Sequence, residues 1–231
     1  MTNAEVQQIA KLTMTIIKSE IKVGMTLQEL RQLAERKMKE LGATSFWYWN
    51  IGAFIFSGRQ TTLSVSGKRY RTAKQCIKED DIITIDLSPQ INNVWGDYAR
   101  TIIIENGVVI NHIDKISNSE WRNGLLMEEK LHSELLKSAT PNTTFEQLHE
   151  YMNEIIIDNG YINLDFAGNL GHSIVTNKRD RIYIEKGNNA KLGSVEYFTF
   201  EPHIAVRSES CNYGFKKENI YYFNKGKLIE L

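Results

Sequence analysis

The chain has 231 residues, of which 42% are hydrophobic and 24% charged, a balance that supports an ordinary globular core. Its 28 Lys and Arg match its 28 Asp and Glu, so the formal net charge of zero gives no support to nucleic acid or an anionic membrane as a partner. No apolar run approaches the ~20 residues of a membrane helix, and the polar N-terminus is unlike a signal peptide. Cys76 and Cys211 match no metal or redox spacing, which favours buried or idle thiols in a reducing cytoplasm.

The order of predicted elements repeats along the chain. Amphipathic helices are expected over about residues 4–22 and 118–138, and each is followed by a second helix with a threonine N-cap, at Thr26 and Thr144. Both second helices end at a glycine, Gly42 or Gly160, after the same number of residues. Strand-rich sequence follows each pair, so we expect two related halves. Because no low-complexity linker divides the chain, we expect a single domain over residues 1–231.

The first half contains two acidic residues on strands that we expect to pair. Residues 81–87 and 95–104 have the apolar, β-branched pattern of strands, and residues 90–93 have the composition of a turn. A hairpin centred between Ile91 and Asn92 places Asp86 directly opposite Asp97, with Cβ atoms roughly 5 Å apart. Like charges so placed destabilise a sheet unless a cation lies between them, and a divalent ion is the candidate.

The second half contains a similar pair. Residues 197–201 and 218–223 have strand patterns, and the polar residues 207–214 between them favour a loop. Antiparallel pairing about this loop brings Glu201 opposite Glu218. His172 lies in a short glycine-rich segment between the two pairs. A single acid or histidine is more often solvated or structural, but two facing acid pairs favour a site for two metal ions.

Five short motifs carry a resemblance to a known family. They are Ile85-Asp86, Gly96-Asp97-Tyr98-Ala99-Arg100-Thr101, Gly171-His172-Ser173-Ile174, Phe200-Glu201-Pro202 and Glu218-Asn219-Ile220. In their order and in the separation of the aspartates, they resemble the pita-bread metallopeptidases: methionine aminopeptidases, aminopeptidase P, prolidase and creatinase. The resemblance implies an α+β fold with two pseudo-symmetric halves around a curved antiparallel sheet and helices outside. Because Asp86 comes too early to leave room for it, we expect the separate N-terminal domain of the proline-peptidase branch to be absent.

The resemblance also implies a set of site residues. The family's metal ligands correspond to Asp86, Asp97, His172, Glu201 and Glu218. They would hold two divalent ions of Mn, Co, Fe or Zn, and these would activate a water for hydrolysis. Glu201 would receive and return the proton, and Arg100 would hold Asp97 or a backbone carbonyl in place. His203 stands where the family usually has glycine. It is either a further catalytic residue that points into the site or a structural residue.

Two departures from the family concern histidines that contact substrate and the developing oxyanion. Residues 56–78 and 173–202 contain no histidine. Ser64, Ser66 or Gly67 falls near the first place, and Lys178 or Arg179 near the second. Loss of such groups costs about 10²–10⁴ in rate if nothing replaces them.

The sequence therefore favours a metal-dependent aminopeptidase or dipeptidase that removes N-terminal residues from short peptides, with Xaa-Pro peptides as first candidates, acting as a monomer or homodimer. The alternatives are a catalytically weak or inactive relative that binds a ligand or partner, and a hydrolase of another small amide. The aromatic residues 46–49 would line the substrate pocket or pack against a helix. The basic residues Lys178, Arg179 and Arg181 would bind a peptide's carboxylate or form a solvated face.

Overall fold

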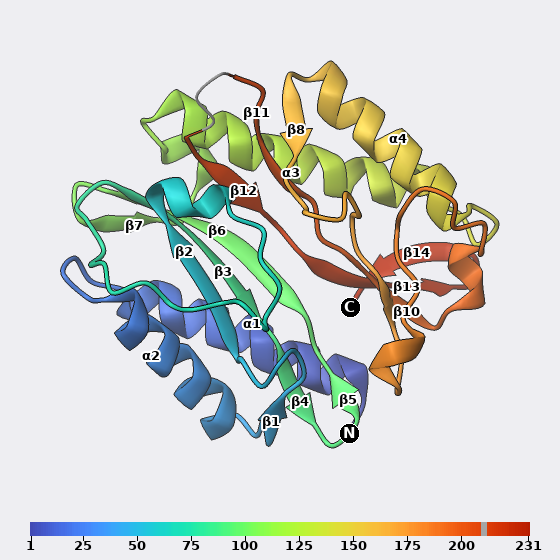
Figure 1. Ribbon diagram of the computed structural model, residues 1–231, viewed down its shortest axis with the longest axis horizontal. Coiled ribbons are helices and arrows are strands. Elements are labelled where there is room, and N and C mark those ends of the chain that lie inside the picture. Colours follow the sequence, from blue (N-terminus) through green and yellow to red (C-terminus); the bar gives the residue numbers. More distant parts are fainter. Residues whose placement is uncertain (209–211) are drawn as a thin grey trace.

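The computed structural model describes residues 1–208 and 212–231, and its four α-helices form two matching pairs (Figure 1). The helices are α1 (Asn3–Glu20), α2 (Leu27–Glu40), α3 (Ser119–Ser138) and α4 (Phe145–Asp158). Helices α2 and α4 have 14 residues each, and each starts with a capping box, in which the N-cap threonine, Thr26 or Thr144, exchanges hydrogen bonds with the residue three positions on. Both helices are followed by a glycine with positive φ, Gly42 at 110° and Gly160 at 79°.

Short strands and 3₁₀ turns make up most of the remaining chain. The strands are β1 (Ser45–Phe46), β2 (Ala53–Ser57), β3 (Asp81–Leu87), β4 (Pro89–Ile91), β5 (Val94–Trp95), β6 (Tyr98–Glu105), β7 (Val108–Ile110), β8 (Tyr161–Asn163), β9 (Ser173–Ile174), β10 (Tyr197–Phe200), β11 (His203–Val206), β12 (Gly214–Lys216), β13 (Asn219–Asn224) and β14 (Lys227–Glu230). The 3₁₀ turns are η1 (Gly58–Thr62), η2 (Ile113–Lys115), η3 (Lys178–Asp180) and η4 (Leu192–Ser194).

The two largest sheets repeat one topology, which confirms the expectation of two related halves. In the first half the strand order is β2-β3-β6-β7, and in the second it is β9-β10-β13-β14. The last two strands of each sheet form a hairpin whose tight turn has two residues with positive φ, Asn106-Gly107 and Lys225-Gly226. The fold is therefore α+β with antiparallel sheets and pseudo-symmetric halves.

The expected register of the first acid pair is wrong by two residues. Strand β3 pairs with β6 so that Asp86 faces Ala99, while Asp97 lies just before β6. The reason is a separate small hairpin, β4–β5, which turns at Asn92 with a positive φ of 55° and shifts the start of the returning strand. A shift of two residues keeps the same face of the sheet, so Asp97 remains a diagonal neighbour of Asp86.

The expected register of the second pair is correct. Strand β10 pairs with β13 with Phe200 opposite Asn219, so Glu201 and Glu218 stand opposite each other one position beyond the ladder. The chain between them is more than a loop, because it also contains strands β11 and β12, which pair with each other.

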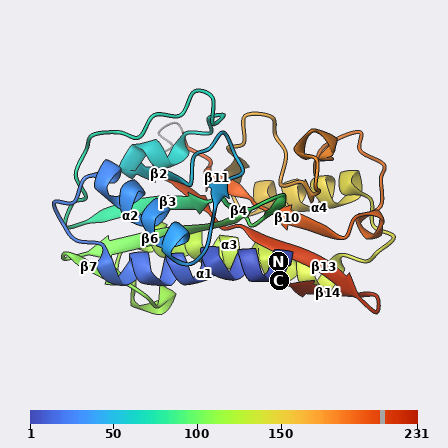
Figure 2. The same cartoon turned by 90° about the horizontal axis from the view of Figure 1, so that it is seen from below.

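Helices cover one side of the sheets and loops cover the other. Figure 2 shows α1 and α3 along one face of the strands, while the loops that follow β2 and β8 lie on the opposite face. One group of buried apolar side chains lies in the first half, and a second fills the other half and also includes Ile82 and Ile103 of β3 and β6. Cys76 is exposed, which differs from the buried thiol that was one expectation, and Cys211 lies outside the described residues. Within residues 1–208 and 212–231, no helix combines the length and apolarity needed to cross a membrane.

Candidate active site

Three acidic side chains from both halves meet where the two sheets adjoin. Asp86 is near the end of β3, Asp97 directly precedes β6, and Glu218 directly precedes β13. The backbone N–H of Glu218 donates to the carbonyl of Ala99 at 3.0 Å, which connects the two sheets at this point. One carboxylate oxygen from each acid lies within 4.8 Å of the other two. The structure thus brings acids from the two halves into one cluster.

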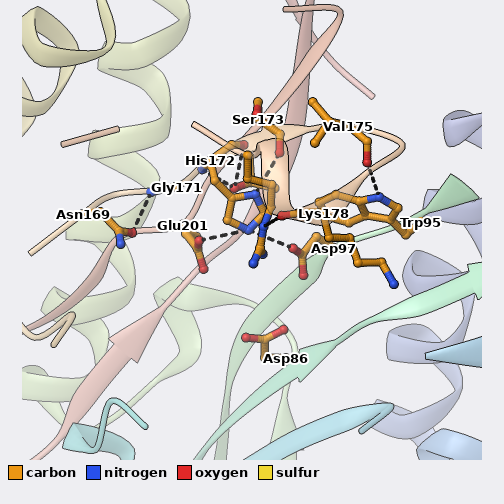
Figure 3. Close-up of polar contacts among 12 residues, drawn as sticks. Asp86, Trp95, Asp97, Asn169, Gly171, His172, Ser173, Val175, Lys178 and Glu201 are labelled. Carbon is orange, nitrogen blue, oxygen red and sulfur yellow. Dashed lines mark hydrogen bonds and ion pairs between the residues drawn. The ribbon is translucent and has the colours of Figure 1, made fainter. Parts of the chain in front are cut away.

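His172 completes the cluster together with Glu201. Its Nε2 atom lies 3.6 Å from Oδ2 of Asp97 and 3.7 Å from Oε1 of Glu201. Figure 3 shows the imidazole between these two carboxylates, with Asp86 on the strand beyond them. The segment can approach β10 this closely because Gly171, with φ at 139°, has no side chain, and a Cβ atom there would lie 2.3 Å from the carbonyl oxygen of Thr199.

The protonation of His172 is fixed by its neighbours. Its Nδ1 lies 3.1 Å from the carbonyl oxygen of Ser173, and because a carbonyl only accepts, the ring proton is on Nδ1. Burial, with the nearby positive charge of Arg181, lowers the pKa of His172 to about 3, so the ring is neutral at physiological pH. Its Nε2 lone pair therefore faces two carboxyl groups, an arrangement that is unfavourable unless a proton or a metal cation lies between them.

The acids themselves also fit a cation. Glu218 is 0% exposed, and neither of its carboxylate oxygens has a hydrogen-bond partner within the described residues. Burial, followed by repulsion from Asp97, raises the pKa of Glu218 well above its usual range; burial, followed by repulsion from Asp86, does the same for Asp97. The orphaned carboxylate of Glu218, with the buried Asp97 and a neutral imidazole beside it, is a donor set that suits a divalent metal ion, so the residues present fit such an ion.

Lys216 also reaches the cluster, a contact that the sequence interpretation missed. Its Nζ atom lies 2.6 Å from Oδ2 of Asp86 and 3.2 Å from Oε2 of Glu201. Burial lowers the pKa of Lys216, but the surrounding carboxylates, Asp86 first, outweigh burial and raise it well above its usual range, so the ammonium stays charged. No local pattern indicated this contact, because Lys216 ends β12 and its partner Asp86 lies on β3 of the other half.

Two other predicted residues surround the cluster. Arg100 donates to the backbone carbonyl of Glu218 at 2.8 Å and to Oδ1 of Asn219 at 2.7 Å. It therefore holds a backbone carbonyl, one of its two expected roles. His203 lines the same pocket as the acids, but its Nε2 is 2.6 Å from the carbonyl oxygen of Thr61 and must donate to it. Burial lowers the pKa of His203 to about 4, so the ring is neutral.

The pocket above the cluster has aromatic and basic walls. Within the aromatic run, Trp47 and Tyr48 line the pocket, Phe46 packs in the core of the first half, and Trp49 is 58% exposed. The rings of Trp47 and Trp95 also contact His172, with centroids 5.6 and 5.7 Å away. The run is thus divided between the pocket and the core, and its contact with substrate stays a prediction.

The basic residues after His172 have different positions. Lys178 donates to the carbonyl of Trp47 and to Gln90, and Arg179 is exposed. Arg181 lines the pocket, with its guanidinium carbon 4.9 Å from the centre of the Trp47 ring. At the place of the first missing histidine, Ser64 lines the pocket and accepts a hydrogen bond from the backbone N–H of Phe166.

Comparison with known proteins identifies the family. A model of metallopeptidase family M24 matches residues 3–225. The chain belongs to metallopeptidase family M24. Among curated proteins, this M24 chain is similar to methionine aminopeptidase 1 of Bacillus subtilis (strain 168), with 34% identity over 106 residues. That alignment covers 44% of the chain and 40% of the relative.

Solved structures share the fold at low sequence identity. The X-Pro aminopeptidase from Thermotoga maritima MSB8 aligns with a TM-score of 0.78 at 20% identity, over 97% of the M24 chain and 58% of that protein. The prolidase from Pyrococcus furiosus gives 0.78 at 20% identity, over 98% and 61%. The methionine aminopeptidase from Thermotoga maritima gives 0.77 at 13% identity, over 99% and 94%. The M24 chain thus spans about three-fifths of the first two proteins and has the pita-bread fold.

Proposed function

We propose that this M24 chain is a cytoplasmic aminopeptidase or dipeptidase that uses two divalent ions to hydrolyse the first peptide bond of short peptides. The observation that carries the proposal is the cluster of His172, Asp97 and Glu218. There a neutral imidazole lone pair and orphaned carboxylate oxygens converge in a buried space. Without a cation such a cluster is costly, and with one it is a metal site.

The five residues would divide between two ion positions. Asp97 and Glu218, at the centre of the cluster, would contact both ions, His172 and Glu201 would hold one, and Asp86 the other. Divalent ions of this kind, Mn, Co, Fe or Zn, supply Lewis acidity and lower the pKa of a nearby water. Arg100 would keep Glu218 in place through its backbone carbonyl.

Glu201 is the residue that would move a proton. Burial, together with repulsion from Asp86, raises the pKa of Glu201 despite the opposing charge of Lys216. A carboxylate with a raised pKa accepts a proton more readily near neutral pH, which suits a group that takes a proton from water and returns it to the leaving amine. Its Oε1 and Oε2 atoms face His172 and Lys216 respectively, so its orientation is fixed.

The walls of the pocket favour a short peptide with a free carboxylate. Arg181 donates from Nε to the carbonyl of Lys178 at 2.9 Å, and within the described residues its two terminal amino groups make no hydrogen bond. Its guanidinium carbon lies over the Trp47 ring, which holds the charged group beside the pocket. A peptide's terminal carboxylate would match this group. Peptides with proline second are the first candidates, because the residues around Arg100 resemble the proline-peptidase branch.

We expect slow turnover. His203 is neutral and carries its ring proton on Nε2, which is used by Thr61, so its other nitrogen only accepts and cannot donate to a developing oxyanion. The family's two histidine places fall near Ser64, Ser66 or Gly67 and near Lys178 or Arg179, none of which is a histidine. Activity about 10²–10⁴ below that of a family member with both histidines is the expected range.

The test is hydrolysis of a panel of dipeptides and tripeptides, including Xaa-Pro members, by protein loaded with each candidate metal. Wild type should release N-terminal residues, and both Glu201→Gln and chelator treatment should abolish the release. If wild type and Glu201→Gln are equally inert with every metal, the proposed activity is wrong. The chain would then act as a ligand- or partner-binding protein. The ion pairs of Lys216 with Asp86 and Glu201 favour this alternative, because they occupy two of the proposed metal ligands.

A further inference from the structure

Lys216 places a positive charge within the group of acids that would hold the ions. It is the last residue of β12, where its backbone N–H donates to Oγ1 of Thr101 at 2.8 Å. From there its side chain reaches both Asp86 and Glu201, at 2.6 and 3.2 Å. The lysine side chain is 18% exposed and those of Asp86 and Glu201 are 22% and 20% exposed, so water screens these contacts only in part.

The contacts of Lys216 divide the cluster unevenly. On the side of His172, Oε1 of Glu201 and Oδ2 of Asp97 face the imidazole and remain free for an ion. On the other side, Asp86 would bind only the second ion, the one that His172 and Glu201 do not hold. Its Oδ2 makes the shorter of the two carboxylate contacts to Lys216. An ion bound to Asp86 would therefore share its carboxylate with an ammonium group.

We infer that Lys216 is a built-in counter-cation for the Asp86 side of the site. It neutralises Asp86 and Glu201 when metal is absent, and it competes with the ion that Asp86 would hold. Once metal binding has ionised all four carboxylates, they and the one ammonium carry a net charge of −3, and an ion at His172 reduces this to −1. The second ion then meets one negative charge less than it would without Lys216, so its binding is weakened. This inference rests on the metal ligands of the proposed function and concerns metal binding rather than catalysis.

The experiment counts bound Mn²⁺ from the electron paramagnetic resonance signal of the free ion during titration of the metal-free protein. Lys216→Met removes the charge at nearly constant length, Lys216→Gln is a second neutral variant, and Lys216→Arg keeps the charge. Lys217→Met is the matched control, because the neighbouring Lys217 pairs with Glu129 instead.

The second ion should bind at least about 10-fold more tightly to Lys216→Met than to wild type, since a unit charge a few ångströms away is worth more than 1.4 kcal/mol at a partly buried site. Lys216→Arg and Lys217→Met should resemble wild type. In chelator, Lys216→Met should melt below both wild type and Lys217→Met, and Mn²⁺ should remove the difference.

Second-ion affinities within about 2-fold of each other in wild type and Lys216→Met would overturn the inference. Failure of both neutral variants to fold with Mn²⁺ present would do the same, because the ion should neutralise the same acids. Peptide hydrolysis with no effect of Lys216→Met on metal affinity would leave the proposed function intact. If Lys216→Met binds the second ion more tightly than wild type but neither protein hydrolyses peptides, the role of Lys216 would stand and the proposed function would be contradicted.

Discussion

Helix α1 of the first half buries Ala10 and Met14 at the places where α3 of the second half buries Glu128 and His132. The two helices end at the same offset from their partners, so these positions correspond. Ala10 and Met14 only pack, whereas the imidazole of His132 contacts Tyr221 and the carbonyl of Lys217 at 2.6 and 3.1 Å. The apolar pattern that builds the fold is common to both halves, whereas the buried polar groups differ: α1 buries Gln7 and Thr13, and α3 buries Glu128 and His132.

The same contrast recurs at the site itself. Asp97 and Glu218 each directly precede a central strand, β6 or β13, and the residue two positions earlier is Trp95 in the first half and Lys216 in the second. Trp95 packs on His172 and donates from its indole N–H to the carbonyl of Val175 at 2.9 Å. Equivalent positions thus supply an apolar wall on one side and a cation on the other. The two acids thus occupy equivalent positions in the two halves, whereas the residues beside them, Trp95 and Lys216, differ in charge.

The largest expected effect comes from removing a central acid. Asp97→Ala should eliminate at least one bound ion and reduce kcat/KM by more than about 100-fold, because even residues behind the ligands contribute 10–100-fold. Glu218→Ala, its equivalent, should behave alike. Asp114→Ala, which removes an exposed carboxylate, is the control. Elemental analysis with unchanged metal content in Asp97→Ala would refute the assignment.

Bound metal should also raise the free energy of unfolding, because its ligands come from both halves. An ion at about 100 times its dissociation constant adds ~2.7 kcal/mol to the free energy of unfolding if it binds only the native state. For a chain of this size that corresponds to a melting temperature roughly 5–10 °C higher. Thermal melts with and without chelator measure the difference. Identical midpoints after confirmed metal loss would count against a site shared by both halves.

A smaller effect, on substrate binding, is expected at Arg181. This residue comes from the second half and lies over the ring of Trp47 from the first. Arg181→Met should raise KM about 10-fold for dipeptides with a free carboxylate, the cost of one charged hydrogen bond, and affect amidated peptides much less. Arg179→Met, which removes an exposed neighbour, serves as the control. Equal changes in KM for free and amidated peptides would contradict a role in carboxylate binding.

The smallest effect is expected at Glu128, where the first half has Ala10. Burial raises the pKa of Glu128 well above its usual range, so the folded protein keeps a proton that the unfolded chain releases above pH ~4.3. Its contribution to stability is complete below that pH and is lost as the pH rises towards the folded-state pKa. Glu128→Gln should therefore be more stable than wild type at pH 7, by about 1 kcal/mol, with the difference shrinking towards pH 4. A difference independent of pH in denaturant melts would show that ionisation is not the cause.

The sequence predicted the elements of the fold because their signals are local. The threonine caps at Thr26 and Thr144 and the glycines after each helix act over a few residues, and each lies where it was expected. The five proposed ligands also come together. Register was harder, because the turn at Asn92 belongs to a small hairpin that strand patterns alone do not reveal. The Asp86–Asp97 pairing survived the error only because a shift of two residues preserves the face.

Lys216 was not foreseen for a different reason. A lysine at the end of a strand is ordinarily a solvated side chain, and its partner Asp86 is 130 residues away in the sequence. Only the packing of β12 against the first half shows that the lysine points into the acids. Long-range charge contacts of this kind depend on tertiary structure and leave little trace in a local pattern.

The most direct test is anomalous diffraction from crystals of the manganese-loaded protein. We expect the strongest peak beside Nε2 of His172, between Asp97 and Glu218, and a weaker peak beside Asp86 that gains occupancy in Lys216→Met. Absence of any peak within reach of Asp97 and Glu218, with manganese present in the crystals, would contradict the central claim that the two halves together form a metal site.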